Sequence, residues 1–98
     1  MDRSQLQSLL EGITSDVYFQ PPAPLQMQYP CIRYERNGSS VQRAANLPYR
    51  LAKRYQITVI DRNPDSTIPD QVEELPMSEF DRWFAADNLN HWVFNLFI

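Results

Sequence analysis

The chain has 98 residues, 43% of them hydrophobic and 12% aromatic, which is typical of one globular domain, here 1–98, rather than of a disordered segment. Its net charge of −3 and its pI of about 4.9 argue against a nucleic-acid-binding domain, because such domains usually carry a basic surface. One cysteine excludes an internal disulfide and no apolar run approaches the roughly 18 residues that cross a bilayer, so we expect a protein made in the cytoplasm without a membrane segment.

The first thirty residues predict a short amphipathic helix, a strand and an extended connection. Asp2 is suited to cap the helix, and Leu6, Leu9, Leu10 and Ile13 recur at helical spacing. Gly12 is expected to end the helix. This segment also lacks the basic and apolar regions of a signal peptide. Residues 16–20 alternate as a strand does, and the proline-rich residues 21–30 are expected to connect it to the next strand.

Two strong strand patterns follow, with a less regular segment between them. Residues 31–36 alternate between apolar and polar side chains, and residues 53–61 are rich in β-branched residues with one apolar face. The sequence NGSS at 37–40 predicts a turn, because Asn-Gly is a strong hairpin signal. We therefore expect residues 37–50 to project from the domain as a long loop or a hairpin arm.

A turn and a short helix are predicted after the second of these strands. Residues 62–66, with the sequence RNPDS, have turn composition. Ile68, Val72 and Leu75 then lie at helical spacing, and Pro76 ends the helix.

The C-terminal residues predict a pair of strands. In the segment 78–87 we expect Phe80 on one face and Trp83 on the other. Residues 88–91 are expected to turn the chain, and 92–98 to form a last strand. That strand is apolar on both faces, so as an edge strand it would invite pairing with another subunit.

The order of these elements, α-β-β-β-α-β-β, predicts the fold class. Consecutive strands joined by short connections favour antiparallel pairing. We expect an α+β domain, with a mostly antiparallel sheet of about five strands and two helices packed on one face.

The lone cysteine and the lone histidine are the first candidates for chemistry. A nucleophilic cysteine needs a base within hydrogen-bond reach, and His91 beside Asn88 and Asn90 leaves a Cys-His-Asn hydrolase open. However, Cys31 begins a strand among residues typical of a core, so a buried structural role is favoured. His91 is expected to pin the nearby turn by bonding to backbone. One cysteine and one histidine also fall short of a zinc site.

The acidic residues do not suggest a catalytic pair. Asp61, Asp65, Asp70, Glu73 and Glu74 fall in a turn and along a short helix, which favours a solvated acidic face over two carboxylates held across a cleft. Two glycines cannot supply a glycine-rich phosphate loop. We therefore expect no catalytic residue, no metal and no cofactor, and a protein that is not an enzyme.

Positive charge is concentrated in the segment 36–54, which contains five of the nine basic residues and no acidic one. Its candidate interface residues are Arg36, Arg43, Tyr49, Arg50, Lys53 and Arg54. We expect this segment to meet Asp70, Glu73 and Glu74 of a second copy. Such head-to-tail contacts close into rings when the rotation between copies allows it. Two alternatives stay open, a grip on a nucleic-acid backbone and a mobile loop with no partner.

Four stretches of the sequence together resemble a family of small tail-assembly proteins of long-tailed bacteriophages. They are VYFQPP (17–22), YPCIRYER (29–36), KRYQITVIDRNPDS (53–66) and DNLNHWVFNL (87–96). The resemblance runs from about Gly12 to Phe97 and is to tail terminators or tail-completion proteins. It implies an α+β fold without catalytic residues, and a ring, usually hexameric, that stops tail-tube polymerisation and docks to the head-side connector.

The resemblance also implies partners and a location. The partners are further copies of the chain, the tail tube protein and the head-side connector or stopper protein, while DNA passes through an acidic lumen without sequence-specific binding. The location is the tail or neck of the virion, after assembly in the host cytoplasm. Two other functions stay open: a head-closure (stopper) protein of the neck, and a small monomeric module that binds a host protein.

Overall fold

The structure, a computed structural model, describes residues 2–22, 26–44 and 47–97, with the backbone alone for 39–44 and 47–52. Two helices and five strands follow one another in the predicted order, which confirms the α+β fold class. They are α1 (Arg3–Glu11), β1 (Val17–Phe19), β2 (Cys31–Ala44), β3 (Leu47–Asp61), α2 (Ile68–Glu73), β4 (Ser78–Ala86) and β5 (Leu89–Phe97). Neither helix in these segments is long and apolar enough to cross a membrane.

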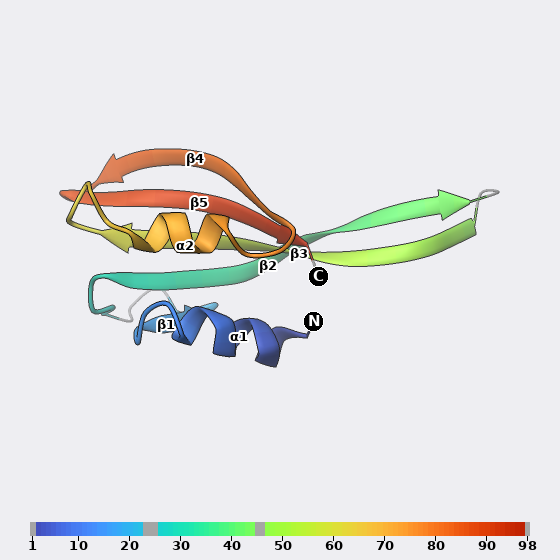
Figure 1. Cartoon of the computed structure of the whole chain (residues 1–98), viewed down its shortest axis with the longest axis horizontal. Coiled ribbons are helices and arrows are strands. Elements are labelled where there is room, and N and C mark those ends of the chain that lie inside the picture. The colour runs from blue at the N-terminus through green and yellow to red at the C-terminus, as the bar shows by residue number, and fades with distance from the viewer. Residues whose placement is uncertain (1, 23–25, 45–46, 98) are drawn as a thin grey trace.

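The five strands form one sheet in the order β1-β2-β3-β5-β4 (Figure 1). β1 pairs with β2 in parallel, and the other three pairings are antiparallel, which confirms a mostly antiparallel sheet. The prediction that the last strand lies at an edge is wrong, because β5 lies between β3 and β4. The central position of β5 explains why both of its faces are apolar. The edges of the sheet are β1 and β4.

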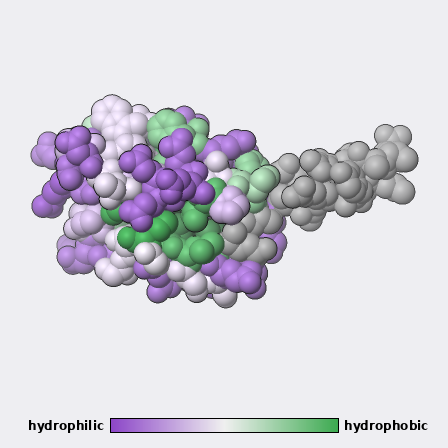
Figure 2. Space-filling model, in the orientation of Figure 1, coloured by the Kyte–Doolittle hydropathy of each residue, from purple (hydrophilic) through white to green (hydrophobic). Residues whose placement is uncertain are grey.

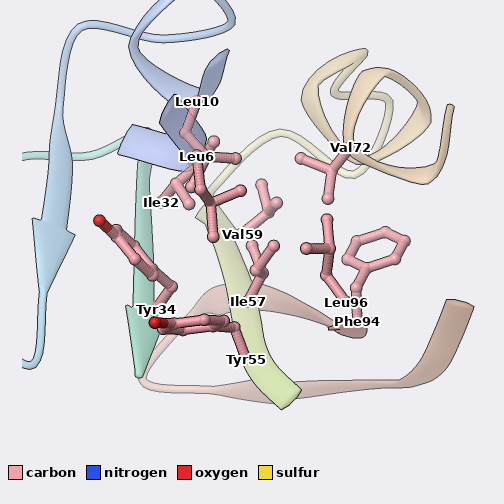
Figure 3. Close-up of a cluster of buried hydrophobic side chains, with 10 residues drawn as sticks. All are labelled: Leu6, Leu10, Ile32, Tyr34, Tyr55, Ile57, Val59, Val72, Phe94 and Leu96. Carbon is pink, nitrogen blue, oxygen red and sulfur yellow. The ribbon is translucent and has the colours of Figure 1, made fainter. Parts of the chain in front are cut away.

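Both helices pack against the same face of the sheet, as predicted (Figure 3). Alternate residues of β2, β3 and β5 point to this face, and each helix contributes one or two fully buried aliphatic side chains. The core consists of Leu6, Leu10, Ile32, Tyr34, Tyr55, Ile57, Val59, Val72, Phe94 and Leu96. Burial of this apolar surface is the main favourable contribution to folding.

Tyr34 ties α1 to the sheet by polar as well as apolar contacts. Its hydroxyl donates a hydrogen bond to the Gln7 side chain and accepts one from the Arg3 guanidinium at 3.2 Å. The Arg3 guanidinium also lies 4.5 Å from the centre of the Phe19 ring. Burial raises the pKa of Tyr34, so its hydroxyl stays protonated and available as a donor.

A second, smaller cluster lies on the opposite face of the sheet. Cys31, Ile60 and Leu89 are buried there, and Tyr18 packs against them. The Gln28 backbone N–H donates to the Tyr18 hydroxyl at 3.1 Å, so part of the proline-rich connection lies against this face. The expected extended connection therefore also shields the reverse side of the sheet.

The turn predicted at residues 37–40 is wrong. β2 continues through all four residues and ends only at Ala44. The pairing with β3 shifts by one residue between Arg36 and Gly38, so Asn37 is the extra residue of a β-bulge. The turn preference of Asn-Gly is overridden because the hydrogen-bond ladder continues past it.

The turn between β4 and β5 is shorter than predicted. It consists of Asp87 and Asn88, whose φ angles of 55° and 62° fit the two-residue turn that hairpins favour. β5 therefore begins at Leu89, and the expected turn over residues 88–91 is wrong in its last three positions.

A bulge in β4 also changes which side chains share a face. The pairing with β5 shifts between Phe80 and Arg82, which makes Asp81 the extra residue. Phe80 consequently lies on the helix side of the sheet, with its ring 5.4 Å from that of Phe94. The expectation that Phe80 and Trp83 lie on opposite faces is therefore wrong.

The contrast between two leucines of α1 tests the core. Leu6 is fully buried, whereas Leu9 is 43% exposed on the same helix. We expect Leu6→Ala to lower the free energy of unfolding by about 3 kcal/mol, since it leaves a cavity against the sheet. Leu9→Ala, the control, should cost less than about 1 kcal/mol. Urea unfolding measures both, and equal losses would contradict this account of how α1 is held.

Candidate functional site

The structure places Cys31 where a nucleophile would be ineffective. Its side chain is fully buried between the sheet and the covering connection. Burial, with smaller contributions from Asp16 and Asp61, raises the pKa of the Cys31 thiol to about 12. The thiol is therefore protonated at neutral pH, whereas the thiolate is the reactive form. This confirms the burial predicted for Cys31.

His91 is held by its own hairpin. Its Nδ1 atom lies 3.2 Å from the Leu89 carbonyl oxygen, and its ring stacks on Phe84 at 4.6 Å between ring centres. This confirms the backbone bond predicted for His91. Among the described residues, no group of three or more His, Cys, Asp or Glu side chains is placed to hold a metal ion.

The basic segment forms the outer part of the β2–β3 hairpin, which projects well beyond the rest of the molecule (Figure 1). We call residues 38–44 and 47–53 the arm. Within the described residues, β1 pairs with β2 only as far as Tyr34, and β5 pairs with β3 only from Arg54 inward. The two strands of the arm therefore pair only with each other. The predicted projection is confirmed as a hairpin.

Three of the predicted interface residues lie near the far end of this arm. Gln42 pairs with Arg50 and Arg43 pairs with Pro48, which leaves Tyr49 as the extra residue of a second bulge. Pro48 has no N–H to donate to the ladder, and a bulge is one of the places where a strand tolerates this. The side chains of Arg43, Tyr49 and Arg50 lie outside the described part of the structure, so only their positions along the ladder are established.

Arg54 is occupied at the root of the arm. Its guanidinium donates to the side-chain oxygen and to the backbone oxygen of Asn37, both at 3.1 Å. A Cβ atom at Gly38 would lie 2.8 Å from the same guanidinium, so glycine is what allows this close approach. Arg54 therefore stabilises the bulge, whereas the neighbouring Lys53 is exposed. The Arg36 backbone N–H bonds to the Gln20 side chain at 3.4 Å.

The acidic residues gather beside exposed aromatic rings. A groove of about 470 Å³ lies between α2, the turn before it and strands β4 and β5. Its lining includes Asp65, Asp70, Glu73, Phe80 and Trp92, and we call it the acidic–aromatic groove. Figure 2 shows hydrophilic side chains over α2 beside apolar surface on the same face. Two of the three acidic residues predicted at the interface, Asp70 and Glu73, thus line one groove.

Glu74, the third acidic residue predicted at the interface, is not among the residues that line this groove. It caps the C-terminal end of α2 and is exposed to solvent. Asp61 also lies apart, where its side chain accepts a hydrogen bond from the Asn63 backbone at 3.0 Å.

The edge strand β4 is a functional candidate that the sequence interpretation missed. Phe80, Trp83 and Phe84 are 48%, 52% and 38% exposed, and β4 pairs on one side only, with β5. An open edge beside exposed aromatic side chains is typical of a surface that is covered on assembly. The three aromatic residues are visible in the sequence, but the order of strands in the sheet, which makes β4 the edge, is not.

A second groove lies on the reverse face of the sheet. It has a volume of about 310 Å³, and its lining includes Tyr29, Arg33, Arg82, Phe84 and His91. Arg82 is already paired with the neighbouring Asp81 at 3.0 Å. This groove holds a mixture of charges and rings and brings together none of the predicted interface residues.

Comparison with known proteins adds no family assignment. No protein-family model matches the chain, and neither the curated proteins nor the solved structures contain a match to it.

The buried thiol gives a prediction about alkaline pH. The pKa of the Cys31 thiol has its ordinary value of 9.0 in the unfolded chain and is raised to about 12 in the folded protein. Above pH 9 the unfolded state therefore loses the proton first, and the free energy of unfolding falls. We expect the free energy of unfolding of the wild type to fall more steeply than that of Cys31→Ala between about pH 8 and pH 11. Chemical denaturation at each pH measures this.

Thiol labelling supplies an independent check of the same environment. A disulfide reagent at about pH 8 should leave native Cys31 unmodified and should react after unfolding in urea. Rapid labelling of the native protein, together with parallel pH curves for the two proteins, would show that Cys31 is accessible.

Proposed function

We propose that this chain is a structural protein of the neck of a long-tailed bacteriophage. In this proposal, copies form a ring, usually hexameric in the family that the sequence resembles, at the head-proximal end of the tail. The ring ends polymerisation of the tail tube and joins the tail to the head-side connector. Its partners are other copies of itself, the tail tube protein and the connector.

The observation that carries this proposal is the arm. A two-stranded ribbon is at best marginally stable on its own in water, because it lacks a second layer to bury its side chains. The described strands of the arm nevertheless extend six residue pairs beyond the last pairing with β5. Such an extension is accounted for when a neighbouring molecule supplies the missing contacts.

Charge supports the same proposal. All twelve acidic residues lie outside the segment 36–54, which has five of the nine basic residues. Opposite charges on separate surfaces favour contacts between unlike patches of successive copies. A net charge of −3 also suits a passage for DNA, since an acidic lumen repels phosphate and prevents tight binding.

Removal of the gene from the virus that encodes it tests the function. We expect tails of uncontrolled length that are not joined to filled heads, because nothing stops tube growth or completes the joint. Electron microscopy of the lysate measures tail length and attachment. Tails of normal length on empty heads would instead indicate a head-closure protein, and unchanged infectious particles would contradict a role in the neck.

A shortened arm separates assembly from folding in the same system. Replacement of residues 39–52 by an Asn-Gly turn should leave the core intact, because the ten core residues described above all lie outside that range. We expect this variant to melt cooperatively as a single chain and to fail to rescue the deletion. Full rescue by the shortened variant would show that the arm is dispensable.

A further inference from the structure

The acidic–aromatic groove offers chemistry that the proposed ring alone does not assign. Asp70 and Glu73 are exposed on α2, with Phe80 and Trp92 lining the same groove. Within the described part of the chain, neither carboxylate forms an ion pair or a side-chain hydrogen bond. The groove thus has negative charge without a described partner, next to aromatic surface.

Carboxylates beside aromatic rings select for organic cations. A guanidinium forms paired hydrogen bonds to a carboxylate and also stacks on an aromatic face. A metal ion is a poorer fit, since these carboxylates are not grouped to hold one among the described residues. A phosphate backbone is excluded by like charge. The chemistry of the groove therefore indicates arginine or lysine side chains.

We infer that the acidic–aromatic groove binds the arm of a neighbouring copy. This inference rests on the ring proposed above. Arg43 and Arg50 supply the positive charge, since both lie near the far end of the ladder, beside Tyr49. Arg54 is excluded because it is already bound to Asn37 at the root.

The dimensions of the molecule allow this contact between copies but not within one. Six residue pairs make an arm roughly 20 Å long, and the body is about as wide, since the molecule measures 49 × 24 × 23 Å. The arm points away from α2 of its own chain (Figure 1). Each copy therefore donates an arm and accepts another, a head-to-tail contact that closes when the rotation allows it.

Charge reversal tests this contact between the arm and the groove. The arm-reversed variant carries Arg43→Glu and Arg50→Glu, and the groove-reversed variant carries Asp70→Arg and Glu73→Arg. Each variant alone should rescue the gene deletion at least about tenfold less well than the wild type, because like charges then meet at the contact. Both should melt as the wild type does, since surface charges contribute little to folding.

Mixing the two variants gives the decisive result. Arms of one variant then complement grooves of the other in both directions, so cells that supply both should recover infectious yield through rings of alternating copies. One chain that carries all four changes should recover as well. Glu74→Arg, at the end of the same helix and outside the groove, and Arg62→Glu, in the turn after β3 and outside both the arm and the groove, are the matched controls and should rescue fully.

Two outcomes would overturn this inference while leaving the ring intact. The first is full rescue by the groove-reversed variant alone. The second is loss of rescue by both variants with no recovery in the mixture or in the fourfold variant, which would indicate that the arm binds another neck or tail protein. Failure of the proposed function is a different result, namely that deletion of the gene itself leaves tails and infectious yield unchanged.

Discussion

The pairing of β2 with β3 is the constraint on which the rest of the structure depends. Its inner half carries Ile32, Tyr34, Ile57 and Val59, on which both helices pack. Its outer half is the arm (Figure 1). Because one hydrogen-bond ladder runs through both halves, the core that folds the body also sets the direction of the arm. The bond between Arg54 and Asn37 lies where the two halves meet.

Strand positions and charge segregation were predictable from the sequence because both are local properties. Residues 32–36 and 54–59 alternate in the sequence and alternate in burial, since one face of each strand packs under the helices. The basic segment 36–54 was equally visible, because no acidic residue interrupts it. The acidic–aromatic groove was not predictable, since it forms only where α2, β4 and β5 meet.

The errors in the sequence interpretation share one physical origin, which is the register and order of strand pairing. Asn37 begins a strong turn signal but lies in a bulge, because β3 continues to offer hydrogen-bond partners beyond it. Asp81 is a bulge that no sequence period reveals, and it moves Phe80 to the helix face. The order of strands in the sheet placed β5 inside and β4 at the edge, and the order along the chain does not contain that information.

The central claim is that the arm functions by lying on a neighbouring copy of the chain around the DNA path of a virion. A reconstruction of the intact neck by electron cryomicroscopy tests it most directly. The account predicts a closed ring of this chain between the tail tube and the head-side connector, with every arm lying across the next subunit. A neck that contains no copy of the chain, or a ring in which the arms extend into solvent, would contradict it.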